Sequence, residues 1–291
     1  MALSVCGLRS QARRAYEWLR ETQRADGSWP RSVSVSGSVL DHAAESHHAA
    51  YVAVGVWHEF LVTGDASFAV SFWPVVRRAI SWTLDLRRPD GSIAWERDAS
   101  GQSGSFALLS GCSSILQGLR CGVALSKLAG EPQPDWETAA DTLALTLRSA
   151  LSATASPVFA DKSRFAMDWY YPVLGGALRG SAAVSRLRSS WDRFVVPGLG
   201  VRCVSDEPWV TIAETCELVL ALDACGLRSE AVSLFEVVHR LREPDGSYWT
   251  GWQYVNQAYF PHERSSWTAA AVVLAADALG GYSGGSALFR D

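Results

Sequence analysis

An internal repeat is the feature that most constrains how this chain folds. Ala2–Trp29 aligns without a gap on Ala221–Tyr248, and both segments contain Cys-Gly-Leu-Arg-Ser and end in Asp-Gly-Ser followed by an aromatic residue. A further Asp-Gly-Ser lies in Leu86–Trp95. Asp-Gly is a turn signal, because glycine accepts positive φ and aspartate bonds to nearby backbone. Helix pairs that repeat with the same turn indicate a solenoid or a closed ring of helical hairpins.

Two kinds of helical segment alternate along the chain. Strongly apolar segments suit an inner layer: Glu45–Val62, Ser113–Leu128, Val173–Ala183, Val210–Ala224 and Ser266–Leu279. Amphipathic segments suit an outer layer: Phe72–Leu86, Asp135–Leu151, Val184–Phe194 and Leu227–Leu241. The alternation predicts an all-α fold, an α/α toroid of five to six hairpins within one domain that spans residues 1–291. Met1–Val5 resembles the tail of a helix, so we expect the first hairpin to be incomplete, and Phe194–Val204 is the one strand candidate.

Composition narrows the classes of partner. The net charge is −4 and the arginines are scattered, which argues against nucleic-acid binding. No apolar run is long enough to span a membrane, and the six cysteines contain no C-x-x-C pair. Arg9, Arg13 and Arg14 interrupt any signal-peptide core, so we expect a cytoplasmic protein with reduced thiols. A second chain could cover Gly7–Gln23, which leaves a homo-oligomer open.

The alternation also predicts where a site lies. Parallel inner helices gather their N-termini at one mouth of the ring, and helix N-termini favour carboxylates and anionic ligands. Polar and aromatic residues lie at these helix starts and in the Asp-Gly-Ser loops. We expect them to form an aromatic-lined pocket for a small-molecule substrate, with no cofactor. The predicted substrate-binding residues are Glu45, His47, His48, Trp95, Trp169, Tyr170, Trp209, Trp249, Trp252, Glu263 and Arg264.

One motif carries a family resemblance. Trp18-Leu19, Gln23, Gly27 and Trp29 resemble the QW motif of squalene-hopene and oxidosqualene cyclases. The segments Met167–Gly176, Gly198–Val210 and Gly246–Gly251 resemble toroid proteins that are commonly labelled prenyltransferases. The resemblance implies an α/α toroid and a biosynthetic enzyme that converts an isoprenoid by Asp/Glu acid/base chemistry in an aromatic cavity. The sequence contains neither D-x-D-D nor D-D-x-x-D. The nearest zinc ligands, Cys203, Asp206 and His262, lack the spacing of the family, so no metal is predicted.

A second resemblance points to carbohydrates. Tyr51–Asp65, Trp73-Pro74 and Gly91–Arg97 resemble six-hairpin glycosidases of the glucoamylase kind, which implies that Glu96 is a general acid. This alternative to the isoprenoid enzyme is a hydrolase or epimerase with Glu96 and Asp168 as acid and base. A third hypothesis is a binding module without catalysis.

Four carboxylates are the catalytic candidates: Asp168, Glu96, Asp206 and Glu214. Each also has a structural interpretation. Glu96 could pair with Arg97, and Asp168 could cap the following helix. Adjacent residues such as Asp206 and Glu207 seldom face the same point, so we expect one of the two to be solvated. Glu214 lies in an apolar helix, where it must find a partner or line the cavity.

Overall fold

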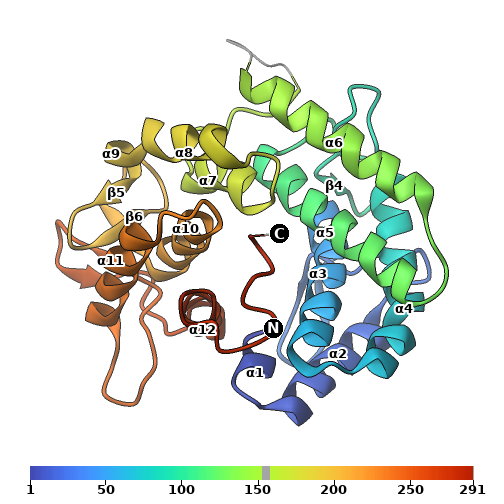
Figure 1. The fold of residues 1–291 in the computed structure, drawn as a ribbon, viewed down its shortest axis with the longest axis horizontal. Coiled ribbons are helices and arrows are strands. Elements are labelled where there is room, and N and C mark those ends of the chain that lie inside the picture. The colour runs from blue at the N-terminus through green and yellow to red at the C-terminus, as the bar shows by residue number, and fades with distance from the viewer. Residues whose placement is uncertain (153–157, 291) are drawn as a thin grey trace. The chain divides into compact units, whose positions relative to one another are not determined.

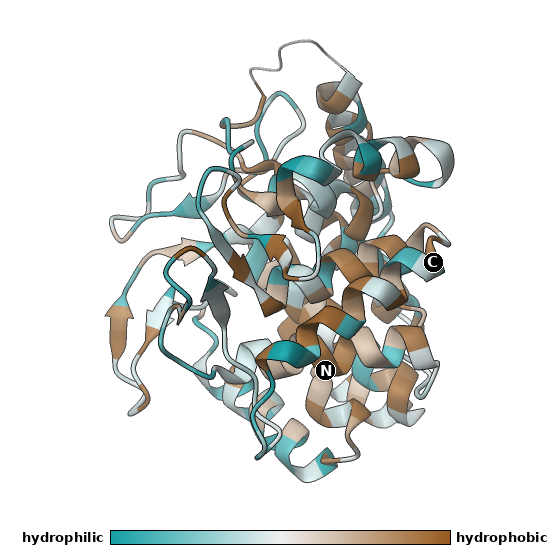
Figure 2. Ribbon diagram, turned by 90° about the vertical axis from the view of Figure 1, so that its left-hand side faces the viewer, coloured by the Kyte–Doolittle hydropathy of each residue, from teal (hydrophilic) through white to brown (hydrophobic). Residues whose placement is uncertain are grey.

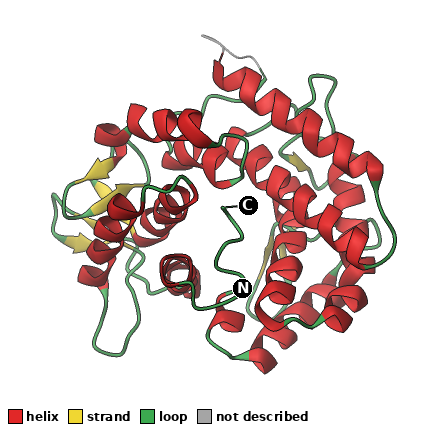
Figure 3. Ribbon diagram, viewed as in Figure 1, coloured by secondary structure: helices red, strands yellow, loops and turns green. Residues whose placement is uncertain are grey.

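The computed structural model describes residues 1–152 and 158–290 and divides the chain into two compact units. The N-terminal unit is Ser10–Asp161, and the C-terminal unit is Lys162–Asp291 together with Met1–Arg9. Each unit is described by itself. Helices dominate both, and the strands are short (Figures 1 and 3). Whether the chain is one domain stays a prediction.

The N-terminal unit is built on two inner helices. Its elements are α2 (Arg9–Thr22), β1 (Ser32–Val33), β2 (Val39–Asp41), β3 (Ala44–Glu45), α3 (Ser46–Thr63), α4 (Ala66–Leu84), β4 (Glu96–Arg97), α5 (Leu109–Leu128) and α6 (Pro134–Ser152). Helix α3 packs against α4 and α5, and α5 packs against α6. A Cβ atom at Gly118 of α5 would lie 2.6 Å from the carbonyl oxygen of Ala50, so this glycine permits the close approach of α3 and α5.

The C-terminal unit is organised around α10. Its elements are α1 (Ala2–Val5), α7 (Ala166–Leu174), α8 (Gly180–Ser189), α9 (Trp191–Phe194), β5 (Val195–Val196), β6 (Gly200–Arg202), β7 (Trp209–Thr211), α10 (Ile212–Ala224), α11 (Arg228–Val238), the 3₁₀ turn η1 (His239–Leu241), β8 (Gly251–Gln253), β9 (Ala258–Tyr259) and α12 (Ser266–Gly280). Helix α10 packs against α7, α11 and α12. Strands β5 to β9 form one antiparallel sheet in sequence order.

The cores follow the predicted division of the helices. Helices α5 and α10 have few exposed positions, whereas α6 and α11 bury one face only. Figure 2 shows hydrophobic residues concentrated in the helices and hydrophilic ones frequent in the loops. No described helix is long and apolar enough to cross a membrane.

All three Asp-Gly-Ser segments form the same turn. In each, the Oδ1 atom of the aspartate accepts the backbone N–H and the hydroxyl of the serine, with N···O distances of 3.0, 2.9 and 3.0 Å at Asp26, Asp90 and Asp245. The glycines have φ of 101°, 82° and 88°. The turn prediction is therefore confirmed.

The predicted bounds of one inner helix are wrong. We expected an inner helix at Val173–Ala183, after Pro172, but α7 begins at Ala166 and contains the proline. Proline leaves the carbonyl four residues earlier without its helical donor. Here Arg186 Nη2 donates to that Asp168 carbonyl at 3.0 Å, so tertiary contact makes an interior proline tolerable.

The strand content was also underestimated, because only Phe194–Val204 was expected to contain strands. Strands of two or three residues such as β7, β8 and β9 are too short for an alternating pattern, and their pairing joins segments far apart in sequence.

We predict that Gly27→Ala destabilises the protein more than Gly246→Ala. Both glycines have positive φ, but a Cβ atom at Gly27 would lie 2.3 Å from the Arg78 carbonyl oxygen, whereas at Gly246 the nearest atom is a side-chain nitrogen at 3.5 Å. Both substitutions place alanine at positive φ, so the difference between their free energies of unfolding measures the clash of the new Cβ atom with the Arg78 carbonyl oxygen. We expect Gly27→Ala to lower the free energy of unfolding by roughly 1–3 kcal/mol more than Gly246→Ala, measured by urea titration. Equal losses would contradict the close approach.

Candidate active site

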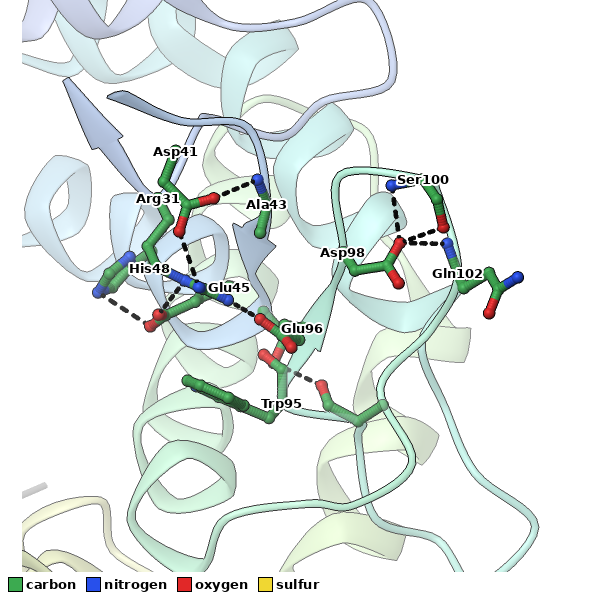
Figure 4. Close-up of polar contacts among 12 residues, drawn as sticks. Arg31, Asp41, Ala43, Glu45, His48, Trp95, Glu96, Asp98, Ser100 and Gln102 are labelled. Carbon is green, nitrogen blue, oxygen red and sulfur yellow. Dashed lines mark hydrogen bonds and ion pairs between the residues drawn. The ribbon is translucent and has the colours of Figure 1, made fainter. Parts of the chain in front are cut away.

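One candidate site lies in the N-terminal unit, where Arg31 gathers three carboxylates (Figure 4). Its Nη1 is 2.8 Å from Asp41 Oδ2 and its Nε is 2.8 Å from Glu45 Oε1. Its Nη2 also forms an ion pair with Glu96. Glu45 and Glu96 are directly opposite each other across the β3–β4 pair. Like charges in that register repel, and the positive charge of Arg31 between them offsets this repulsion.

Local structure fixes the third carboxylate. Asp41 Oδ1 accepts the backbone N–H of Ala43 at 2.9 Å. This bond, and then the charge of Arg31, lowers the pKa of Asp41.

Two histidines extend the cluster on the first turn of α3. The Nε2 atoms of His47 and His48 lie 3.3 and 3.5 Å from Glu45 Oε2. Burial, and then His48, lowers the pKa of His47 to about 3, so its ring is neutral near neutral pH. Glu45, His47 and His48 each offer one ligand atom, and these atoms lie within 4.8 Å of one another, so they could hold a metal ion. The Arg31 guanidinium and the positive end of α3 disfavour a cation there.

Trp95 completes the N-terminal cluster. Its half-buried ring stacks on Phe106 with centroids 5.3 Å apart, and the Arg31 guanidinium carbon lies 5.1 Å from the ring centroid. Glu96 therefore pairs with Arg31, not with Arg97 as its structural interpretation held. The structure brings together Glu45, His47, His48, Trp95 and Glu96 of the predicted set.

A second candidate site lies in the C-terminal unit, on the first two turns of α10. Glu217 Oε2 accepts the Tyr170 hydroxyl at 2.5 Å, and its Oε1 accepts the Tyr171 hydroxyl at 3.0 Å. Glu214, three residues earlier, accepts a short hydrogen bond from Thr211. Residues three apart lie on the same helix face, so the two carboxylates are neighbours.

The environment of Glu217 keeps a proton available. Burial, and then the charge of Glu214, raises its pKa from the ordinary 4.5 to about 7, although both tyrosine bonds act in the opposite direction. The same burial, together with Glu217, raises the pKa of the Tyr170 hydroxyl, which remains a donor. Glu217 is thus partly protonated at neutral pH.

Asp168 and Trp169 lie in the interior of the C-terminal unit. Asp168 is 6% exposed and sits within the first turn of α7, whose N-cap residue is Phe165. Trp169 donates its indole N–H to the Arg186 carbonyl at 2.8 Å and stacks on Phe194. Tyr170 is fully buried and reaches the second site only through its hydroxyl.

The remaining predicted residues lie elsewhere in the C-terminal unit. Asp206 is exposed and paired with Arg164 at 3.0 Å. Arg264 is exposed and pairs with Asp245 at 3.0 Å, while Glu263, also exposed, accepts the Thr250 hydroxyl. The loop tryptophans make local contacts. Trp209 donates its indole N–H to the Phe260 carbonyl, and Trp249 donates its own to Glu243. The Trp249 ring also stacks on Tyr259, which Trp252 contacts edge-on.

Sequence reasoning missed Arg31 and Glu217. Arg31 lies outside the helical segments and Asp-Gly-Ser turns from which the candidates were chosen. Glu217 had a usable signal, because it lies one turn after Glu214 on the same face of an apolar helix.

The comparisons with known proteins favour carbohydrate chemistry. The sequence is 52% identical to the "MMP endo-(1,4)-3-O-methyl-alpha-D-mannosidase" of Mycolicibacterium hassiacum over 290 residues, covering 100% of this chain and 79% of that protein. The chain belongs to the family of this mannosidase. No protein-family model matches the chain.

Solved structures agree on the fold. An uncharacterised conserved protein from Thermus thermophilus has a TM-score of 0.72 at 14% identity, covering 94% of this chain and 90% of its own. A rhamnosidase from Klebsiella oxytoca has a TM-score of 0.64 at 16% identity, and the match covers 90% of this chain and 52% of the rhamnosidase. A D-mannose isomerase has a TM-score of 0.62 at 11% identity, and the match covers 88% of this chain and 76% of the isomerase. These likenesses concern the fold alone, and they confirm the all-α, α/α-toroid fold class.

The predicted prenyltransferase or terpene-cyclase function, a transferase activity, is wrong, because the 52% identical relative is a mannosidase. The QW-like residues have structural roles here. Gln23 donates to the carbonyls of Gly27 and Val75 at 2.9 and 3.0 Å, and Trp29 donates to the Leu19 carbonyl at 2.9 Å. Such residues fasten a hairpin and carry no information about the reaction. The glycosidase-like alternative agrees with the family.

We predict that Arg31→Gln lowers the free energy of unfolding by about 1–3 kcal/mol, because Glu45 and Glu96 are left opposite each other. Glu96→Gln in that background should recover part of the loss, since it removes one of the two charges. Urea unfolding of the single and double variants measures both effects.

Arg77→Gln is the matched control. Arg77 forms an exposed ion pair with Glu131 at 3.0 Å, and such pairs contribute little. A loss at Arg31 no larger than at Arg77, or no recovery in the double variant, would contradict the role of Arg31.

Proposed function

We propose that this protein is an endo-acting glycoside hydrolase that cleaves α-(1,4) bonds between 3-O-methyl-D-mannose units. The substrate is that named for the relative with 52% identity over the whole chain. The observation that carries hydrolysis is the Glu217 carboxyl, held by two tyrosines, with a pKa raised to about 7.

Glycoside hydrolysis uses a pair of carboxyl groups, one of which donates a proton. In our proposal Glu217 protonates the glycosidic oxygen as the bond from that oxygen to the anomeric carbon breaks. Water supplies the hydroxyl that joins the anomeric carbon, and Glu214 accepts the proton of this water. A pKa near the working pH suits a general acid.

The N-terminal cluster has a different role in the proposal. Glu45 and Glu96 are both ion-paired with Arg31, and the proposal gives neither of them the role of general acid. Carboxylates and imidazoles accept hydrogen bonds from hydroxyls, and we assign Glu45, Glu96 and His48 to sugar hydroxyls. Asp168, buried and packed beside Arg186, and Asp206, exposed and paired with Arg164, have no catalytic role in this assignment.

We expect Glu217→Gln to lower kcat/KM on 3-O-methylated α-(1,4)-mannan by roughly 10²–10⁴-fold, because the amide cannot donate the proton that the leaving group needs. Chromatography of the released oligosaccharides measures the rate. It also separates hydrolysis, which creates new reducing ends, from epimerisation, which does not.

Glu207→Gln is the control, since Glu207 is an exposed acid in the same unit. Undiminished cleavage by folded Glu217→Gln would remove Glu217 from the mechanism. Absence of cleavage by the unaltered protein on methylated and unmethylated mannans would overturn the proposed substrate.

The raised pKa of Glu217 makes a prediction that does not depend on substrate. The folded-state value, about 7, exceeds the ordinary 4.5. The unfolded chain therefore loses this proton first, and stability falls as pH rises from 4.5 to 7. Glu217→Gln lacks this loss, so its stability relative to the unaltered protein should increase over that interval and level off above it.

Urea unfolding at several pH values measures this difference. Asp206→Asn is a comparison in which a carboxylate pKa is lowered, by hydrogen bonds from Arg164. A difference between Glu217→Gln and the unaltered protein that is independent of pH would contradict the raised pKa.

A further inference from the structure

A pocket of about 250 Å³ in the N-terminal unit belongs to neither carboxylate cluster. It lies between the first Asp-Gly-Ser turn and the loop after β4. Two of its residues, Ala44 and Arg97, pair across β3 and β4. Because side chains alternate along a strand, they face away from Glu45 and Glu96. The lining residues are Arg24, Asp26, Ser28, His42, Ala44, Trp82, Arg97, Asp98, Ala99 and Gly101.

Two hydrogen-bond donor atoms among the lining residues are buried and have no partner. Arg97 Nε and Trp82 Nε1 have no hydrogen-bond partner among the described residues. The Arg97 guanidinium carbon lies 5.7 Å from the Trp82 ring centroid, and Trp82 is only 1% exposed. A buried donor without a partner costs about 1–3 kcal/mol. A ligand with acceptor atoms would offset this cost.

The acidic side chains of the pocket are occupied by their own turns. Asp26 Oδ1 accepts from Ser28, and Asp98 Oδ1 accepts the backbone N–H groups of Ser100 and Gln102 at 2.8 and 3.0 Å (Figure 4). Across the described ranges, neither Arg24 nor Arg97 forms an ion pair with a carboxylate. Asp26 and Asp98 keep their negative charges, but no guanidinium nitrogen of Arg24 or Arg97 lies within ion-pair distance of a described carboxylate, so these nitrogens remain available as donors to a ligand.

We propose that this pocket binds an anionic group of a small ligand, a carboxylate or a phosphate, through Arg24 and Arg97, with the Trp82 indole as an additional donor. Oxyanions only accept hydrogen bonds, which matches the two buried atoms without a partner, because both are donors. A guanidinium offers paired N–H groups that suit carboxylate and phosphate oxygens. The inference stands apart from the proposed hydrolysis, because it uses no residue of the Glu214 and Glu217 pair.

The test is a titration of the full chain with inorganic phosphate and, separately, with acetate, followed by calorimetry and by the indole N–H resonances in ¹⁵N-labelled protein. Trp82→Phe identifies the Trp82 resonance. We expect saturable binding that shifts this resonance and weakens by about tenfold or more in Arg97→Gln and in Arg24→Gln. Tighter binding of phosphate or of acetate shows whether the pocket prefers a phosphate or a carboxylate group.

Controls keep the result interpretable. Arg97→Lys retains the charge and should bind more tightly than Arg97→Gln, and Arg77→Gln, at an exposed ion pair with Glu131, should leave binding unchanged. Three results would overturn the proposal: no saturable binding of either anion, binding that both glutamine variants retain, or equal arginine-dependent binding of the neutral probe methyl α-mannoside.

Discussion

The Asp-Gly-Ser turn is the local interaction on which the loops of this protein depend. One aspartate oxygen satisfies both the backbone and the side chain of the serine, and the glycine supplies positive φ. The turns follow α2, α4 and η1, where an amphipathic segment ends. Each turn reverses the chain, and an aromatic residue lies two to four residues after the glycine of the turn. Two of these aromatic residues, Trp29 and Trp95, fix their surroundings by a hydrogen bond and by stacking.

The two carboxylate clusters show how neighbouring charge assigns chemistry to identical groups. Glu45 and Glu96 share the Arg31 guanidinium, and the proposal assigns them to accepting hydrogen bonds. Among the residues that the structure describes, Glu217 has no ion-pair partner, and it lies beside another carboxylate in a buried environment, which raises its pKa to about 7. A carboxyl group in an apolar helix is costly, and this cost is what separates Glu217 from the exposed Asp206.

The mistaken isoprenoid function has a definite physical source. Gln23 and Trp29 donate to main-chain carbonyls and so fix the turn after α2 to its neighbouring helices. These contacts stabilise the hairpin and do not depend on the reaction. A motif that satisfies the scaffold therefore identifies the scaffold, whereas the reaction depends on side chains that the scaffold leaves free to vary.

The sequence by itself determined the helical hairpins, their turns and the division into inner and outer helices, because these follow from periodicity and from contacts within a few residues. It also placed Glu45, His47, His48, Trp95 and Glu96 among the candidates, since helix starts and turns can be located locally. Only the tertiary structure decided that Arg31 joins Glu45 to Glu96 and that Tyr170 and Tyr171 reach Glu217. Those partners lie 14 to 65 residues apart in sequence, and the pKa of a carboxyl depends on how burial and charge combine at one point in space.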